Sequence, residues 1–181
     1  MKSPDHDAPV EVMWEGRFIT TKRRGNWEYV SRSRGIRAAV IIAVDDEDHV
    51  LLVEQFRVPL GRSTIELPAG LIGDDDSSDD EDALSAAGRE LEEETGYRAA
   101  SLEDMGDFYS SPGMVSESFN LIRARGLTKV GEGGGVEGEN ITVHRVPRAG
   151  LSDFLAEKRK SGCGVDVRML LLLGQGIIEG E

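Results

Sequence analysis

The sequence predicts an α/β fold of the α+β type, in which a mixed sheet carries helices on both faces. Three features of the chain predict this fold. Many short segments have the composition of strands, a helix with amphipathic spacing lies in the middle, and two helical segments follow at the C-terminal end. A chain of 181 residues is long enough for one such domain with a buried core and a small appendage.

A small antiparallel unit is expected to precede the main domain. Val10–Thr20 and Trp27–Arg32 have the composition of short strands, and residues 23–26 are the expected turn between them. A ribbon of this size is marginally stable alone and needs a surface to pack on, which a partner subunit could provide. We therefore divide the chain into an N-terminal β unit, residues 1–35, and a main domain, residues 36–181.

The main domain is expected to begin with a central hairpin. Arg37–Val44 and His49–Glu54 are dense apolar runs separated by a charged turn, as in the middle of a sheet. Further strands are expected at Thr64–Leu67, Ser101–Tyr109, Glu117–Arg125 and Asn140–Val146, and helices at Leu151–Lys160 and Val165–Ile178, the second capped by Asp166. Lys129–Glu139 contains five glycines and is expected to form a mobile loop.

Composition argues against several classes of function. The formal net charge of −13 and the pI near 4.7 disfavour nucleic-acid binding, which depends on neutralising phosphates. Cys163 is the single cysteine, so an internal disulfide and a cysteine metal cluster are excluded. No apolar run approaches the ~18–20 residues of a membrane helix, and the N-terminal segment lacks the apolar region of a signal peptide. A cytoplasmic location without membrane contact is therefore expected.

Three glutamates predict a cation site on the central helix. Glu90, Glu93 and Glu94 stand at i, i+3 and i+4, so a helix places their carboxylates on one face. Like charges on one face repel one another unless a cation lies between them, although a solvated acidic face is the commoner arrangement. Carboxylates without histidine or cysteine favour Mg²⁺ or Mn²⁺, which commonly meet phosphate oxygens in their remaining positions. The residues alone therefore predict metal-dependent phosphate chemistry.

The order of residues in this helix resembles the Nudix box, G-x5-E-x7-R-E-U-x-E-E-x-G-U, in which U is aliphatic or aromatic. The stretch Glu81–Tyr97, EDALSAAGRELEEETGY, matches the specified positions from the first glutamate onward at fixed spacing. The box glycine departs from the pattern, because Asp75 stands six residues before Glu81. Gly70 is the better candidate. Ten residues then separate Gly70 from Glu81 instead of five. We place this five-residue expansion within residues 74–80, which form either a solvated acidic loop or an extra cation site.

The resemblance to Nudix hydrolases implies an α/β/α sandwich and a set of metal ligands. Glu90 and Glu94 look like direct ligands, and Glu93 would bind the metal directly or through water. The carbonyl of Ala69 would complete the shell. Arg89 would orient the glutamates through a salt bridge rather than touch the substrate.

Two further residues of the box have roles at the ends of the helix. Gly96 fits the left-handed position that ends a helix. Glu81 has two interpretations: it forms a capping box with Ser78 at the start of the helix, or it acts in the outer shell of the metal.

Within the Nudix family the chain is most similar to the ADP-ribose and ADP-sugar pyrophosphatases. Trp27, Glu28 and Arg32 resemble their nucleotide-binding strand, where they would stack on adenine, accept from its amino group and meet phosphate respectively. Arg57, in the segment EQFR, would reach the diphosphate, and Glu117 belongs to a segment that resembles the loop on the ribose side. Trp27 could instead be a core residue of the ribbon and Arg57 a surface cation.

In that subfamily a glutamate on the loop before the last strand activates or positions the attacking water. Glu137 and Glu139 are the candidates here, and proximity to Ile141 favours Glu139. A glycine-rich loop would let this residue close over the substrate, whereas a merely solvated loop would have no catalytic role.

The resemblance implies Mg²⁺-dependent, or Mn²⁺-dependent, hydrolysis of ADP-ribose or a related nucleoside diphosphate sugar to AMP and a sugar phosphate. It also implies a homodimer that exchanges its N-terminal strands, so that Trp27 would serve the partner's site. Two alternatives remain open. The substrate could be GDP-mannose, a dinucleoside polyphosphate or NADH, or the chain could be a non-catalytic Nudix domain that senses a ligand. The complete glutamate set argues against the last.

Overall fold

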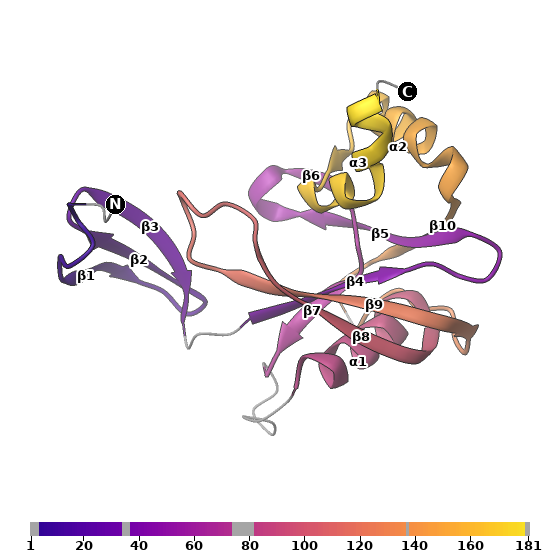
Figure 1. The fold of residues 1–181 in the computed structure, drawn as a ribbon, viewed down its shortest axis with the longest axis horizontal. Coiled ribbons are helices and arrows are strands. Elements are labelled where there is room, and N and C mark those ends of the chain that lie inside the picture. The colour runs from indigo at the N-terminus through magenta and orange to yellow at the C-terminus, as the bar shows by residue number, and fades with distance from the viewer. Residues whose placement is uncertain (1–3, 34–36, 74–81, 137, 180–181) are drawn as a thin grey trace.

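The computed structural model describes residues 4–33, 37–73, 82–136 and 138–179. Within these residues it contains two four-stranded mixed sheets, a three-stranded antiparallel sheet and three α-helices (Figure 1). The mixed sheets and the helices make up the body, and the three-stranded sheet projects from one end of it. The α+β class predicted from the sequence is confirmed.

The projecting sheet has three strands where two were expected: β1 (Val10–Glu15), β2 (Ile19–Arg24) and β3 (Trp27–Arg32). The stretch expected as one strand is broken because the chain turns after β1, where the N–H of Gly16 donates to the carbonyl of Ile19 at 2.9 Å. The turn between β2 and β3 is also shorter than expected, because Arg23 and Arg24 pair with β3. Gly25 makes this tight turn with φ +57°.

The two sheets of the body have the orders β7-β4-β9-β8 and β10-β5-β6-β11. The first contains β7 (Ala69–Ile72), β4 (Arg37–Ala43), β9 (Ser118–Lys129) and β8 (Tyr97–Tyr109). The second contains β10 (Thr142–Pro147), β5 (His49–Arg57), β6 (Arg62–Glu66) and β11 (Gly164–Val165). Each sheet has one parallel pair, β4 with β9 and β11 with β6, and is otherwise antiparallel.

The hairpin expected between Arg37–Val44 and His49–Glu54 is wrong. These strands meet at a single bridge between Val44 and Val50 and then enter different sheets. Their residues are densely apolar because each strand is buried on both faces of its sheet. In β4, Val40 belongs to one core cluster while Ile41 belongs to the other.

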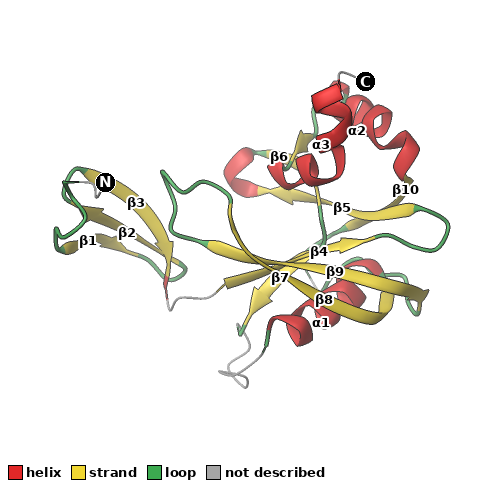
Figure 2. Cartoon of the chain, in the orientation of Figure 1, coloured by secondary structure: helices red, strands yellow, loops and turns green. Residues whose placement is uncertain are grey.

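The helices cover the sheets from two sides (Figure 2). Helix α1 (Ala83–Thr95) packs on β7, β4 and β8, with Ala86, Ala87 and Leu91 buried. Helices α2 (Leu151–Lys160) and α3 (Leu170–Glu179) lie on the side of the second sheet, whose core includes Leu151 and Leu155. In the described part of the chain, no helix is long and apolar enough to cross a membrane.

Helix α1 ends as expected but begins later. Gly96 follows the last turn in the left-handed conformation, with φ +75°, and its N–H donates to the carbonyl of Glu92. At the other end Asp82 is the N-cap and accepts from the backbone N–H groups of Leu84 and Ser85 at 2.9 and 3.0 Å. The capping box expected from Ser78 and Glu81 lies outside the described residues, as does the acidic insertion.

The C-terminal helix is also shorter than expected. Val165 belongs to β11, and a 3-10 helix, Val167–Met169, precedes α3. Asp166 caps this short helix, since its carboxylate accepts from the backbone N–H of Arg168 at 2.8 Å. The pairing of β11 with β6 therefore takes up Val165, which local periodicity assigns to a helix, and it brings Asp166 and Arg168 to the lining of a cavity.

Candidate active site

A cavity of about 770 Å³ lies where α1, both sheets of the body and the segment after β11 meet. This is in the range of pockets that hold nucleotide-sized ligands. Its charged lining is mixed: three arginines and six acidic residues contribute, namely Arg32, Arg57, Arg168, Glu66, Glu90, Glu94, Glu117, Glu139 and Asp166. Such a lining suits a ligand that carries anionic groups together with a cation.

Helix α1 supplies two carboxylates to the cavity, those of Glu90 and Glu94. Glu94 is 5% exposed, and its Oε2 accepts a hydrogen bond from the backbone N–H of Ala69 at 2.9 Å. Gly70 explains how β7 can approach so closely, because a Cβ at this position would overlap the carboxyl group of Glu90. The contact with Glu90 therefore requires a glycine at position 70, and its place as the first glycine of the box stays a prediction. Glu93 is on the same helix but does not line the cavity.

The electrostatics of Glu94 favour a bound cation. Burial raises the pKa of its carboxyl group to about 8, and the nearby charges of Glu90 and Glu139 act in the same direction. The hydrogen bond from Ala69 and the charge of Arg57 oppose this shift. A carboxylate held in this state gains most from a divalent cation, which favours its ionised form.

Two glutamates fit a Mg²⁺ site that relies on other oxygen ligands. Among the described residues, no group of three or more acidic, histidine or cysteine side chains is arranged to hold a metal ion. Mg²⁺ commonly binds through one or two carboxylates and fills its remaining positions with water and substrate phosphates. Glu90 and Glu94 could serve as these carboxylates, and Ala69 also lines the cavity. Direct ligation by Glu93 stays a prediction.

Arg89 contacts the glutamates as the sequence predicts. Its Nη1 donates to Oε1 of Glu90 at 2.8 Å and to Oε2 of Glu93 at 3.4 Å. Its Nη2 lies 3.5 Å from the carbonyl of Leu71 in β7. Arg89 thus joins both glutamates to the neighbouring strand and is not among the residues that line the cavity.

The glycine-rich loop after β9 is attached to the end of α1. The N–H groups of Gly134 and Gly135 donate to the carbonyls of Glu94 and Glu93 at 2.9 and 3.0 Å. The last carbonyls of a helix lack intrahelical donors, and this loop supplies them. A Cβ at Gly133 would overlap the backbone of the helix end. In this part of the loop, the expected mobility is therefore replaced by fixed backbone contacts.

This attachment brings Glu139 to the cavity. The carboxylate of Glu139 accepts from the backbone N–H of Val136 at 2.9 Å, and its carbonyl lies 3.5 Å from Nε2 of Gln55. Glu139 lines the cavity together with Glu94. Glu137, the other candidate, lies outside the described residues.

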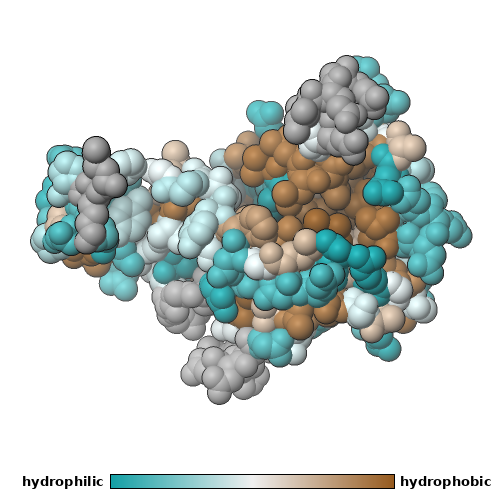
Figure 3. Space-filling model, viewed as in Figure 1, coloured by the Kyte–Doolittle hydropathy of each residue, from teal (hydrophilic) through white to brown (hydrophobic). Residues whose placement is uncertain are grey.

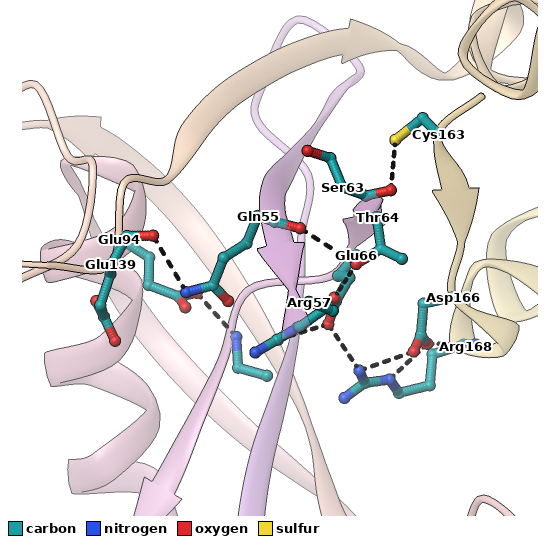
Figure 4. Close-up of polar contacts among 11 residues, drawn as sticks. Gln55, Arg57, Ser63, Thr64, Glu66, Glu94, Glu139, Cys163, Asp166 and Arg168 are labelled. Atoms are coloured by element: carbon teal, nitrogen blue, oxygen red, sulfur yellow. Dashed lines mark hydrogen bonds and ion pairs between the residues drawn. The ribbon is translucent and has the colours of Figure 1, made fainter. Parts of the chain in front are cut away.

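Arg57 lies opposite α1 in a network that sequence reasoning did not find. Its Nε and Nη2 donate to the two carboxylate oxygens of Glu66 at 2.6 and 2.8 Å (Figure 4). Arg168 donates to Glu66 at 3.2 Å and forms a two-point ion pair with Asp166. Although burial acts the other way, the hydrogen bonds and charge of Arg168 lower the pKa of Asp166. The available signal was Glu66 itself, an acidic residue between Ile65 and Leu67, because a buried carboxylate requires a partner.

The structure divides the expected nucleotide-binding residues. Arg32 and Glu117 both line the cavity, and Nε of Arg32 donates to Oε1 of Glu117 at 2.5 Å. Backbone hydrogen bonds of Val30 with Met114 and Ser116 fix this corner. Trp27 and Glu28 do not line the cavity, and Trp27 is 53% exposed. Within one chain the structure therefore separates Trp27 and Glu28 from the other site residues.

The chain belongs to the Nudix family, whose NUDIX domain matches residues 35–154. It is 36% identical over 123 residues to a methanol dehydrogenase activator of Bacillus methanolicus, an alignment that covers 67% of this chain and 64% of that one.

Two further relatives and one solved structure are informative. The chain is 40% identical over 95 residues to the ADP-ribose pyrophosphatase of Bacillus subtilis, covering 52% of this chain and 49% of the relative. It is 37% identical over 149 residues to the GDP-mannose pyrophosphatase of Cronobacter sakazakii, covering 77% and 72%. A crystal structure of an ADP compounds hydrolase has the same fold, with a TM-score of 0.67, 24% identity and coverage of 95% and 93%.

Proposed function

We propose that the protein is a divalent-metal-dependent pyrophosphatase that cleaves ADP-ribose or a related nucleoside diphosphate sugar into AMP and a sugar phosphate. The observation that carries this proposal is the position of Arg57 and Arg32 in the same cavity as Glu90 and Glu94. A diphosphate between them would meet a cation on one side and guanidinium groups on the other. The similarity to an ADP-ribose pyrophosphatase supports the choice of substrate.

The residues of the chain have separate tasks in this proposal. Glu90 and Glu94 would hold Mg²⁺, or Mn²⁺, which when bound neutralises diphosphate charge and lowers the pKa of a coordinated water. Arg57 would stabilise the charge that builds on the phosphate oxygens. Glu139 would orient the attacking water and accept its proton, since it lies on a loop attached to the end of α1.

A second copy of the chain would complete the nucleotide site. Residues 1–37 contain eight Lys or Arg and five Asp or Glu, whereas the whole chain has a net charge of −13. The projecting sheet also exposes large apolar side chains, with Val12 58%, Trp14 56% and Trp27 53% exposed. Figure 3 shows that the face of this sheet turned to the viewer is mostly hydrophilic, while apolar residues gather on the body.

We propose a homodimer in which this basic, partly apolar sheet packs on the acidic body of the partner. Trp27 and Glu28 of one chain would then reach the adenine in the other chain's cavity. Light scattering at micromolar concentration should give twice the mass of 19.7 kDa. A monomer under these conditions would contradict the exchange. A cytoplasmic location stays a prediction.

A substrate panel tests the activity. With Mg²⁺ present, ADP-ribose, GDP-mannose, NADH and a dinucleoside polyphosphate are compared by kcat/KM, and the products are separated by chromatography. Release of AMP and ribose 5-phosphate from ADP-ribose at the highest kcat/KM supports the proposal. Rapid turnover of GDP-mannose without turnover of ADP-ribose would replace it with the second candidate, which the similarity to a GDP-mannose pyrophosphatase favours. Tight binding without turnover of any compound would indicate a ligand sensor.

A further inference from the structure

Glu66 is a buried carboxylate that lines the cavity without being free to bind a ligand. It is 3% exposed. Its Oε1 accepts from Nε of Arg57 at 2.6 Å and from Oγ1 of Thr64 at 2.5 Å. Its Oε2 accepts from Nη2 of Arg57 at 2.8 Å and from Nη2 of Arg168 at 3.2 Å. A carboxylate has about four acceptor positions, so all of them are used. Glu66 therefore acts through its neighbours and not as a metal ligand.

The neighbour that reaches toward the reaction is Arg57. A guanidinium has five N–H donors in a fixed planar arrangement, and Glu66 takes one edge of it in a two-point contact. Among the described residues, none accepts a hydrogen bond from Nη1 of Arg57. Figure 4 shows the free end of Arg57 directed to the side of Gln55, Glu94 and Glu139. The side chain is 41% exposed, so without Glu66 it would sample several rotamers.

Glu66 is itself held from the far side of the cavity. Arg168 donates to Glu66 and to both carboxylate oxygens of Asp166, and its guanidinium lies 5.9 Å from the ring centroid of Phe119. The two arginines and two carboxylates balance in charge, which is what allows Glu66 to be ionised while buried. Asp166 thus holds Arg168, Arg168 holds Glu66, and Glu66 holds Arg57.

We propose that Glu66 is a positioning residue of this hydrolase, which fixes the guanidinium of Arg57 so that its free edge faces the diphosphate. This inference rests on the proposed function, because it assigns Arg57 to the diphosphate. The inference goes beyond the proposed function because it assigns the orientation of Arg57 to a residue on β6, outside the Nudix box. Loss of Glu66 should therefore affect the transition state more than the binding of substrate, because a displaced guanidinium still attracts the anion.

The first test replaces the carboxylate by its neutral isostere. In Glu66→Gln, one oxygen becomes an amide N–H₂ group that faces the donors of Arg57 and breaks the two-point contact. We expect kcat for ADP-ribose to fall ~10–100-fold and KM to change less than ~3-fold. Glu54→Gln is the matched control, because Glu54 pairs with Lys158 and His144 and does not line the cavity. It should lower the melting temperature and leave kcat within ~2-fold.

A double-mutant cycle separates positioning from a structural role. If Glu66 acts through Arg57, then Glu66→Gln should lower kcat less than ~3-fold in an Arg57→Gln background. An equal loss in both backgrounds would overturn the proposal. So would a lower melting temperature with unchanged kcat and KM.

The position of Arg57 is also measured directly, by crystal structures of the native protein and of Glu66→Gln, so that the result does not depend on turnover. Absence of ADP-ribose hydrolysis by the native protein would contradict the proposed function alone. Displacement of the Arg57 guanidinium in Glu66→Gln would still support Glu66 as the positioning residue. An unchanged position of the guanidinium in Glu66→Gln would overturn this role.

Discussion

The carboxylate of Glu94 accepts a hydrogen bond from the backbone N–H of Ala69 at 2.9 Å, and this contact joins helix α1 to strand β7 at the wall of the cavity. The position of Glu94 disfavours its ionised form, since the residue is 5% exposed and burial raises the pKa of its carboxyl group to about 8. The helix therefore holds a group that is ionised only with difficulty unless a cation is present.

Stability of the metal-free protein should decrease with rising pH because of Glu94. An unperturbed glutamate has a pKa of 4.5, whereas the pKa of Glu94 in the folded protein is about 8, so between these values the unfolded state loses a proton that the folded state keeps. The free energy of unfolding therefore falls across this window as the pH rises. Thermal unfolding in EDTA from pH 5 to pH 8 measures the slope. Glu94→Gln should flatten it, and an unchanged slope would contradict the assignment.

Neutralising a glutamate of α1 should reduce activity strongly where its side chain lines the cavity and less where it does not. Glu90→Gln and Glu94→Gln are expected to lower kcat/KM by ~10²–10⁴-fold and to weaken Mg²⁺ binding, because each removes a charged ligand. Glu93→Gln should lower kcat/KM less, since Glu93 does not line the cavity. Glu92→Gln is the control on the same helix, where Glu92 pairs with the exposed Arg98. Full activity of Glu90→Gln and Glu94→Gln would rule out the catalytic assignment.

Removing the carboxylate of Glu139 should slow the chemical step. We expect kcat of Glu139→Gln to fall ~10²–10⁴-fold, the contribution typical of a general base, with KM changed only a few-fold. Glu132→Gln in the same loop is the control, because Glu132 is 93% exposed and pairs with Lys129. Steady-state kinetics of ADP-ribose hydrolysis distinguish the two. Equal activity of both variants would remove Glu139 from the mechanism and leave Glu137 to be tested.

A methyl group at position 70 should damage the cation site while the fold survives. The added Cβ of Gly70→Ala would overlap the carboxyl group of Glu90 and force it away from the cavity. Mg²⁺ titrations should show weaker activation, and kcat should fall at saturating ADP-ribose. Gly150→Ala is the matched control, because no atom lies within 4 Å of a Cβ there. Wild-type Mg²⁺ dependence of Gly70→Ala would show that Glu90 is not a ligand.

Local patterns account for much of what the sequence predicted correctly. The spacing of Glu90 and Glu94 depends only on helical periodicity, and the same is true of the stop at Gly96. Helix α2 occupies Leu151–Lys160 as predicted, because its charged and apolar residues alternate at helical spacing within one segment. Arg57 was predicted through a resemblance that included its neighbours in the chain, and it lies in the cavity.

The errors arose where long-range pairing overrides local preference. Val44 and Val50 meet in one bridge, yet their strands lie in different sheets, where β4 pairs with β7 and β9 and β5 pairs with β6 and β10. Val165 entered β11 because β6 offers a free edge to a chain that would otherwise be helical. The glycine-rich loop is held by the carbonyls of Glu93 and Glu94, which are orphaned only because α1 ends there.

The sequence by itself determined the family and the acidic face of α1, because helical spacing and residue type fix these within one short segment, and from that face it predicted the chemistry of a hard cation. Only the tertiary structure decided which groups meet that face. It brought Glu139 from a distant loop, and it connected Arg57 through Glu66 to Arg168. A buried carboxylate must find its donors among residues that the chain brings close only by folding, and no local pattern records which ones they are.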